Sequence, residues 1–186
     1  MSNFKETGKG IVTWILKKFL KVSFADHAKG KLTWKLEKFK AKDGKEILQK
    51  GVKPYQVIER EFECLLNEGI GNFIDLICGL GSPTAWNNAN ARIGVGNDAT
   101  APSASQTGLL GASKLYKGMN AGYPQKSGQQ SIFQGDFING EAEFAWLEEA
   151  IDNGAVALID ICRQNTSLGT KPAGQTWRLT GTITWS

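Results

Sequence analysis

The sequence predicts a mainly β fold with one or two helices: an antiparallel β-sandwich with a packed helix and an N-terminal amphipathic arm. The second half of the chain holds several short segments of β-forming residues, separated by turns rich in Gly, Asn and Ser. The composition, with 22 glycines, 41% hydrophobic and 22% charged residues, is typical of a globular chain. We therefore expect a basic arm over residues 1–28 and a sandwich domain over residues 29–186.

The arm is predicted from residues 9–24, in which apolar side chains recur at helical spacing and lysines take the other side. A short amphipathic helix fits this pattern, although residues 11–16 also fit a buried strand. The helix can pack on its own domain, dock on a partner protein or lie on a lipid surface, and the sequence leaves these roles open. For docking on a partner, the contact residues would be Trp14, Leu16, Lys17, Lys18, Phe19, Leu20 and Lys21.

Residues 31–40 alternate apolar and polar side chains, which predicts a half-buried strand. The Asp-Gly pair in Lys42–Lys45 is a strong hairpin signal, so the chain should return as a strand near Tyr55–Arg60. Lysines interleaved with aromatic residues also occur in proteins that bind nucleic acids. Here the aromatic side chains fall on the apolar face rather than beside the charges, which argues against nucleic acid as a partner.

A helix facing the core is predicted over residues 61–79, where apolar residues recur at helical spacing. Gly69 and Gly71 weaken such a helix by about 1 kcal/mol each relative to Ala, unless they mark a kink or close packing against the sheet. Gly79 and Gly81 are expected to end it.

From residue 91 onward the sequence predicts strands and turns. Val156–Cys162 is apolar on both faces, as in a central strand, and Asn139-Gly140 predicts a tight hairpin turn. The segment Glu141–Ile151 also fits a helix. Residues 92–110 fit a strand that runs into an ordered loop, because turn-forming residues follow the strand. The expected strands cover residues 91–96, 113–119, 130–138, 141–149, 155–163 and 175–185.

Three cysteines and a single histidine limit the chemistry of the chain. Cys64 and Cys78 lie in the predicted helix, where their spacing corresponds to about 21 Å, too far for a disulfide. Together with Cys162 they are expected to be reduced, buried thiols made in a cytoplasm. With His27 alone, no His-based triad or polyhistidine metal site is available, and we expect no cofactor. We expect no membrane span and no secretory signal, because the apolar segments are short and interrupted by lysines.

Charge is divided unevenly along the chain. Residues 1–60 hold 15 Lys and Arg against 6 Asp and Glu, a net charge of +9, and residues 61–186 hold 7 against 12, a net charge of −5. A basic front and an acidic body are suited to docking on an acidic protein surface or to head-to-tail contact between copies. The alternative is that the lysines only keep exposed faces soluble.

The acidic residues near residue 140 are the best candidates for catalysis, because two carboxylates about 5–9 Å apart can hydrolyse a glycosidic bond. Glu141 and Glu143 are expected on one face of a strand, with no apolar surroundings to raise a carboxyl pKa as a general acid requires, and charges on a solvent-facing strand are common, so no catalytic residue is assigned. The acidic residues of this group are Asp136, Glu141, Glu143, Glu148 and Glu149. A calcium site at Asn97, Asp98 and Asp136 matches no known loop spacing, so no metal site is assigned.

Exposed aromatic residues suggest that the protein binds glycans on a cell surface, because aromatic rings stack on sugar rings. Trp86 and Tyr123 are the two candidates, because each lies in a turn-rich stretch where a large ring can face solvent.

The chain also carries an ordered series of short motifs over residues 60–186. They are Gly94-x-Gly96, Ser105-Gln106-Thr107-x-Leu109, Gly122-Tyr123-Pro124, Phe144-Ala145-Trp146, Ser167–Lys171 and the closing strand Thr176–Ile183. In this order the motifs resemble those of small structural proteins of tailed bacteriophages. Two features depart from the series: the first 25 or so residues have no counterpart, and Glu148-Glu149-Ala150 stands where a smaller polar segment is expected.

The resemblance implies a non-enzymatic virion protein that is made in the host cytoplasm. It would form a homo-oligomer and adhere to capsid, connector or tail proteins, and head decoration, neck attachment and tail attachment all remain open. Host-glycan binding is the alternative function, and a wall-degrading glycosidase is a third.

Overall fold

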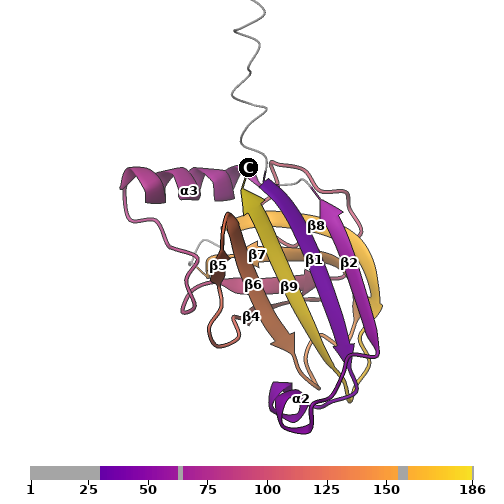
Figure 1. Ribbon diagram of the computed structural model, residues 1–186. Helices are drawn as coiled ribbons and strands as arrows, with labels where there is room; N and C mark the ends of the chain where they lie inside the picture. The colour runs from indigo at the N-terminus through magenta and orange to yellow at the C-terminus, as the bar shows by residue number, and fades with distance from the viewer. Residues whose placement is uncertain (1–29, 63–64, 155–158, 186) are drawn as a thin grey trace, which may run out of the picture. The chain divides into compact units, whose positions relative to one another are not determined.

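The computed structural model describes residues 30–62, 65–154 and 159–185, all of which belong to one compact unit, Gly30–Trp185. This unit is mainly β, with two antiparallel sheets packed together and two helices (Figure 1). The predicted β-sandwich with a packed helix is therefore confirmed. The predicted arm lies outside the described residues, and with it the contact residues Trp14, Leu16, Lys17, Lys18, Phe19, Leu20 and Lys21.

Five of the described strands form the first sheet, and β9 (Thr176–Trp185), the last of them in sequence, lies in its middle. In sheet order they are β2 (Gln56–Phe62), β1 (Gly30–Phe39), β9 (Thr176–Trp185), β6 (Gln130–Phe137) and β5 (Gln125–Ser127). Leu179 of β9 lies opposite Leu36 of β1 on one side and Gly135 of β6 on the other. Apolar residues of β1 and β9 alternate with polar ones and face the core, as their sequences predicted.

Four strands form the second sheet, in the order β4 (Lys114–Gly118), β3 (Arg92–Gly96), β7 (Ala145–Asp152) and β8 (Asp160–Thr170). Because β8 is an edge strand, the prediction of a central strand over Val156–Cys162 is wrong for its described part, residues 159–162. Its apolar character has another cause. The backbone N–H of Leu66 donates to the carbonyl of Ile161 at 3.0 Å, so the segment before the second helix covers this part of the edge.

Large aromatic side chains fill the space between the sheets. Trp146 of β7 contacts Phe137 of β6 and Trp177 of β9 edge to face, at ring-centroid distances of 4.8 and 4.9 Å. All three rings are buried, and such edge-to-face pairs add stability beyond the area they bury. The two contacts tie the sheets to each other.

Between β1 and β2 the chain forms a short helix, α2 (Gly44–Lys50), so the hairpin turn predicted at Lys42–Lys45 is wrong. Asp43 caps this helix, and its carboxylate accepts a hydrogen bond from the Glu46 N–H at 2.8 Å. The same Asp side chain suits a tight turn and a helix N-terminus, which is why the signal was ambiguous. The return strand, β2, occurs where the sequence predicted it.

The second helix, α3 (Asn67–Cys78), is shorter than the helix predicted over residues 61–79, because the first of those residues belong to β2. Phe62 pairs with Leu32 across the sheet, and this pairing outweighs the helical spacing of the apolar residues. A Cβ on Gly69 would lie 2.6 Å from the Asp160 carbonyl oxygen, whereas a Cβ on Gly71 would meet nothing within 4 Å. Gly69 therefore allows close packing of α3 on β8, and Gly71 has no such role.

Two further predictions need correction. The strands β6 and β7 belong to different sheets, so the turn at Asn139-Gly140 carries the chain between sheets and does not close a hairpin. The segment that fitted either a strand or a helix is the strand β7, which begins at Ala145 rather than at residue 141.

The cysteines also differ from expectation. Cys162 is buried, as predicted, but Cys78 is exposed at the end of α3. Cys64 lies outside the described residues.

Candidate functional site

The outward side of α3 exposes an apolar surface. Ile70, Ile74 and Ile77 are 40%, 50% and 68% exposed, and their spacing of four and three residues places them on one side of the helix. We call these three residues the α3 stripe; the exposed Leu80 follows it in the chain. Figure 1 shows α3 at the margin of the sandwich.

The inner side of α3 is packed on the sandwich. Gly69 and Asn72 are buried, and the Phe73 ring stacks on the Trp185 ring of β9 at a centroid distance of 4.9 Å and an interplanar angle of 9°. The Asn72 amide donates to the Thr84 carbonyl at 3.1 Å. Because α3 is apolar toward the sandwich and also away from it, it resembles a helix with neighbours on both sides.

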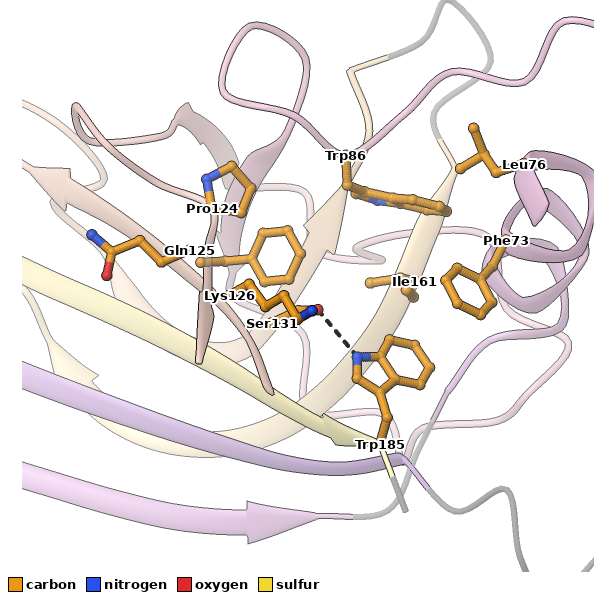
Figure 2. A pocket seen from close by; sticks show the side chains of 10 residues that line it. Phe73, Leu76, Trp86, Pro124, Gln125, Lys126, Ser131, Ile161 and Trp185 are labelled. Carbon is orange, nitrogen blue, oxygen red and sulfur yellow. Dashed lines mark hydrogen bonds between the residues drawn. The ribbon is translucent and has the colours of Figure 1, made fainter. Parts of the chain in front are cut away.

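A small apolar cavity of about 320 Å³ lies where α3 meets the two sheets. Figure 2 shows Trp86, Phe73 and Trp185 around it, with the Trp185 ring N–H hydrogen-bonded to the Ser131 hydroxyl at 3.1 Å. The Trp86 ring N–H is buried and has no hydrogen-bond partner in the part of the chain that the structure describes. Trp86, a predicted glycan contact, therefore lines an apolar cavity.

Tyr123, the other predicted glycan contact, lies in a different hollow. This groove of about 680 Å³ runs beside α2 and is lined mainly by polar side chains, including Asn120, Gln134 and Asp136. The Asn120 amide donates to Asp136 Oδ1 at 2.9 Å and to Gln134 Oε1 at 3.0 Å, and Gln134 donates to the Tyr123 hydroxyl at 3.3 Å. Arg178 holds Asp136 through two hydrogen bonds of 2.7 and 2.8 Å. The structure thus places Trp86 and Tyr123 in two separate hollows.

A buried charged network joins strands β7 and β8 of the second sheet to the loop between β3 and β4. Glu148 and Arg163 are both fully buried, and the Arg163 Nε donates to Glu148 Oε2 at 2.8 Å. Glu148 also accepts hydrogen bonds from the backbone N–H groups of Leu110 and Gly111. Arg163 donates to the Thr100 carbonyl at 3.1 Å. These contacts hold the loop between β3 and β4, which the sequence predicted to be ordered.

Further carboxyl groups in this region have altered acidity. Burial, reinforced by nearby Asp152, raises the pKa of Asp160 to about 8. Burial also raises the pKa of Glu149 well above its ordinary value, with the neighbouring Glu148 adding to the shift. Glu149 is fully buried, and its two oxygens have no hydrogen-bond partner among the described residues. Glu148 and Glu149 are therefore buried, unlike the charges of a solvent-facing strand.

The remaining carboxylates of the predicted acidic group are engaged in local contacts. Glu141 and Glu143 lie in the turn before β7 and not on a strand. Glu141 pairs with Lys117, and Glu143 accepts a hydrogen bond from the Gly140 N–H at 2.8 Å.

No group of three or more metal-ligating side chains occurs among the described residues. Within that same part of the chain, neither helix has the length and apolar character needed to cross a bilayer.

Sequence reasoning missed the α3 stripe, although it included all three isoleucines in the predicted helix. It took every apolar residue of that helix as core-facing. The missing signal is that apolar residues cover more of the helix circumference than one face can bury.

Comparison of the chain with protein-family models, with curated proteins and with solved structures finds no match.

Proposed function

We propose that this protein is a non-enzymatic structural component of a tailed-bacteriophage virion, made in the host cytoplasm, that works by adhesion to other proteins. The single observation that carries the adhesive role is the α3 stripe. Three isoleucines at 40%, 50% and 68% exposure on one helix side form an apolar surface that a protein partner would cover. The phage setting is proposed from the motif series in residues 60–186.

The rest of the fold suits a scaffold. The aromatic contacts between the sheets and the buried Glu148–Arg163 pair give a body with a fixed internal packing. Asp136, Glu141, Glu143 and Glu148 hold loops, turns and ion pairs within that body. In this proposal residues 9–24 supply a second adhesive surface, through Trp14, Leu16, Lys17, Lys18, Phe19, Leu20 and Lys21.

The test is incorporation into particles. Host cells that carry the phage genome with a tagged copy of the gene are lysed, and particles are purified on a density gradient. We expect the full chain to co-purify at fixed stoichiometry and a particle reconstruction to show it on the head, neck or tail. A chain that stays in the soluble fraction would overturn the proposal.

A matched pair of variants separates adhesion from folding. Ile74→Lys places a charge in the α3 stripe and should abolish incorporation. Val57→Lys changes a residue of nearly the same exposure, 49% against 50%, on β2 at a distance from α3 in the fold, and should leave incorporation intact. Equal loss in both variants would argue against a role for the stripe.

Host-glycan binding is the second candidate function, and the groove at Tyr123 favours it. An aromatic ring beside amide and carboxylate groups is the combination that stacks on and hydrogen-bonds to sugars. In this case Tyr123→Ala should weaken adhesion to host cells without lowering the unfolding midpoint. Trp86→Ala tests the other predicted contact, and adhesion unaffected by either change would exclude these two residues as glycan contacts.

A further inference from the structure

We propose that the α3 stripe is the docking site for residues 9–24 of a second copy of this chain. This inference rests on the proposed adhesive function and names the partner of that surface. It follows from three observations: the uncovered apolar side of α3, the charge of the segment that contains α3, and the composition of residues 9–24.

The first observation is geometric. The inner side of α3 is already occupied by the sandwich, through Gly69 against β8 and Phe73 against Trp185. The stripe therefore cannot be a part of that packing, and it needs an occupant from outside the described fold. Three isoleucines one helical turn apart form the kind of surface that accepts the apolar side of another helix.

The second observation is electrostatic. The helix α3 carries two acidic residues, Glu68 and Asp75, and no Lys or Arg, whereas Glu61 before it is already paired with Lys31 at 2.7 Å. Two copies of α3 packed against each other would bring these acidic residues together with no Lys or Arg of either helix to compensate them. The occupant should therefore be apolar on one side and basic beside it.

The third observation is that the chain itself contains such a segment. Residues 9–24 carry four lysines, Lys9, Lys17, Lys18 and Lys21, and no Asp or Glu, together with apolar residues at helical spacing. Exchange of one identical segment between copies is a low-cost route to an oligomer, because each copy supplies both halves of the contact.

The place where the segment joins the body agrees with this arrangement. Gly30, the first described residue, pairs with Trp185, and Trp185 stacks on Phe73 of α3. Residues 1–29 are thus connected to the body at the end that carries α3. Two copies that meet at this end would need only a short connection for their segments to exchange.

The test is a complementation experiment with the full chain. The first variant, Leu16→Asp with Phe19→Asp, disables the segment, and the second, Ile74→Asp with Ile77→Asp, disables the stripe. Sedimentation velocity at about 50 µM, far above the Kd of a micromolar contact, reports association. Circular dichroism confirms that each variant is folded, and Leu48→Asp with Val57→Asp serves as the control on other exposed apolar residues.

We expect the wild type and the control to associate, and each disabled variant alone to sediment as a monomer with association weakened at least tenfold. An equimolar mixture of the two disabled variants should regain a two-chain species, because one copy keeps the segment and the other keeps the stripe. Raising the salt to about 0.5 M should weaken association, since charge pairs contribute to it.

Three results would overturn the inference. A wild type that stays monomeric would mean that the stripe is covered within one copy or by a different protein. Association of the segment variant alone would indicate stripe-to-stripe pairing, and a mixture that stays monomeric would exclude exchange. The proposed function fails separately, since a chain that associates in this way can still be absent from particles.

Discussion

The Arg163 guanidinium donates to the Glu148 carboxylate at 2.8 Å, and neither side chain is exposed to solvent. The pair joins the adjacent strands β7 and β8, and Glu148 also binds the backbone N–H of Gly111 at 2.7 Å. One buried ion pair thus fixes both a strand pair and the loop that covers it. A buried charge without its partner is costly, so this pair is a sensitive point of the fold.

Glu148→Gln should destabilise the protein by up to about 3–5 kcal/mol, because it removes the buried partner of Arg163 and leaves only the more distant, one-third exposed Asp98 carboxylate at 3.6 Å. Urea unfolding followed by tryptophan fluorescence measures the loss. Glu61→Gln is the matched control, since Glu61 pairs with Lys31 at 2.7 Å on an exposed surface, and it should change stability by less than about 1 kcal/mol. Similar losses in both variants would mean that the buried pair has no special role.

Stability should fall as the pH rises from about 5 to about 8. The raised pKa of Asp160, about 8, means that the folded state keeps a proton that the unfolded chain releases near pH 4, so unfolding releases a proton in this range. Each such proton contributes a slope of about 1.4 kcal/mol per pH unit. Glu149, whose pKa is also raised, acts in the same direction.

Asp160→Asn should make this dependence shallower and raise stability at pH 8, as measured by urea unfolding at four pH values. Glu59→Gln, at an exposed position, should leave the slope unchanged. An unchanged slope in the Asp160 variant would show that Asp160 is ionised in the folded protein.

A pair of glycine substitutions tests the packing of α3. Gly69→Ala should lower stability by about 1–3 kcal/mol, because its Cβ would collide with the backbone of β8 and push the helix away. Gly71→Ala should instead raise stability by up to about 1 kcal/mol, since its Cβ meets no neighbour and Ala favours the helix. Thermal unfolding of the two variants gives the comparison, and a stable Gly69 variant would contradict the close contact.

Removal of residues 1–25 should leave a folded, soluble domain. The buried core described for Gly30–Trp185 is built from the two sheets and their loops, so we expect the unfolding midpoint to change by less than about 4 °C. Differential scanning calorimetry against the full chain provides the measurement. The shortened chain should also lose the ability to join particles. If it aggregates or unfolds, the first 25 residues contribute to the core.

Much of the strand pattern was predictable, because alternation is a local property. Trp34 and Leu36 in β1, and Leu179 and Ile183 in β9, alternate with polar residues, and each pair is buried as its spacing predicted. The ambiguity at Asp43 was also local, since an Asp before a Gly suits both a turn and a helix cap, and the sequence alone does not decide between them.

The candidate site was harder to predict, because it depends on contacts between distant parts of the chain. Glu148 can be buried because Arg163 and the Gly111 backbone N–H donate hydrogen bonds to it. No residue near Glu148 in the sequence indicates these partners. Likewise, Ile74 faces outward because Gly69 packs the opposite side of α3 against β8. Sheet order is equally non-local, and it places Asp160–Cys162 in an edge strand rather than in a central one.

The central position of β9 has a consequence for synthesis. This strand lies between β1 and β6, yet it is formed by Thr176–Trp185, which leave the ribosome after all the other strands. The first sheet therefore cannot close until Thr176–Trp185 has left the ribosome, and a chain broken off before Thr176 lacks the strand that joins the two halves of this sheet. Prematurely terminated copies would be left for proteolysis and would not compete with intact ones.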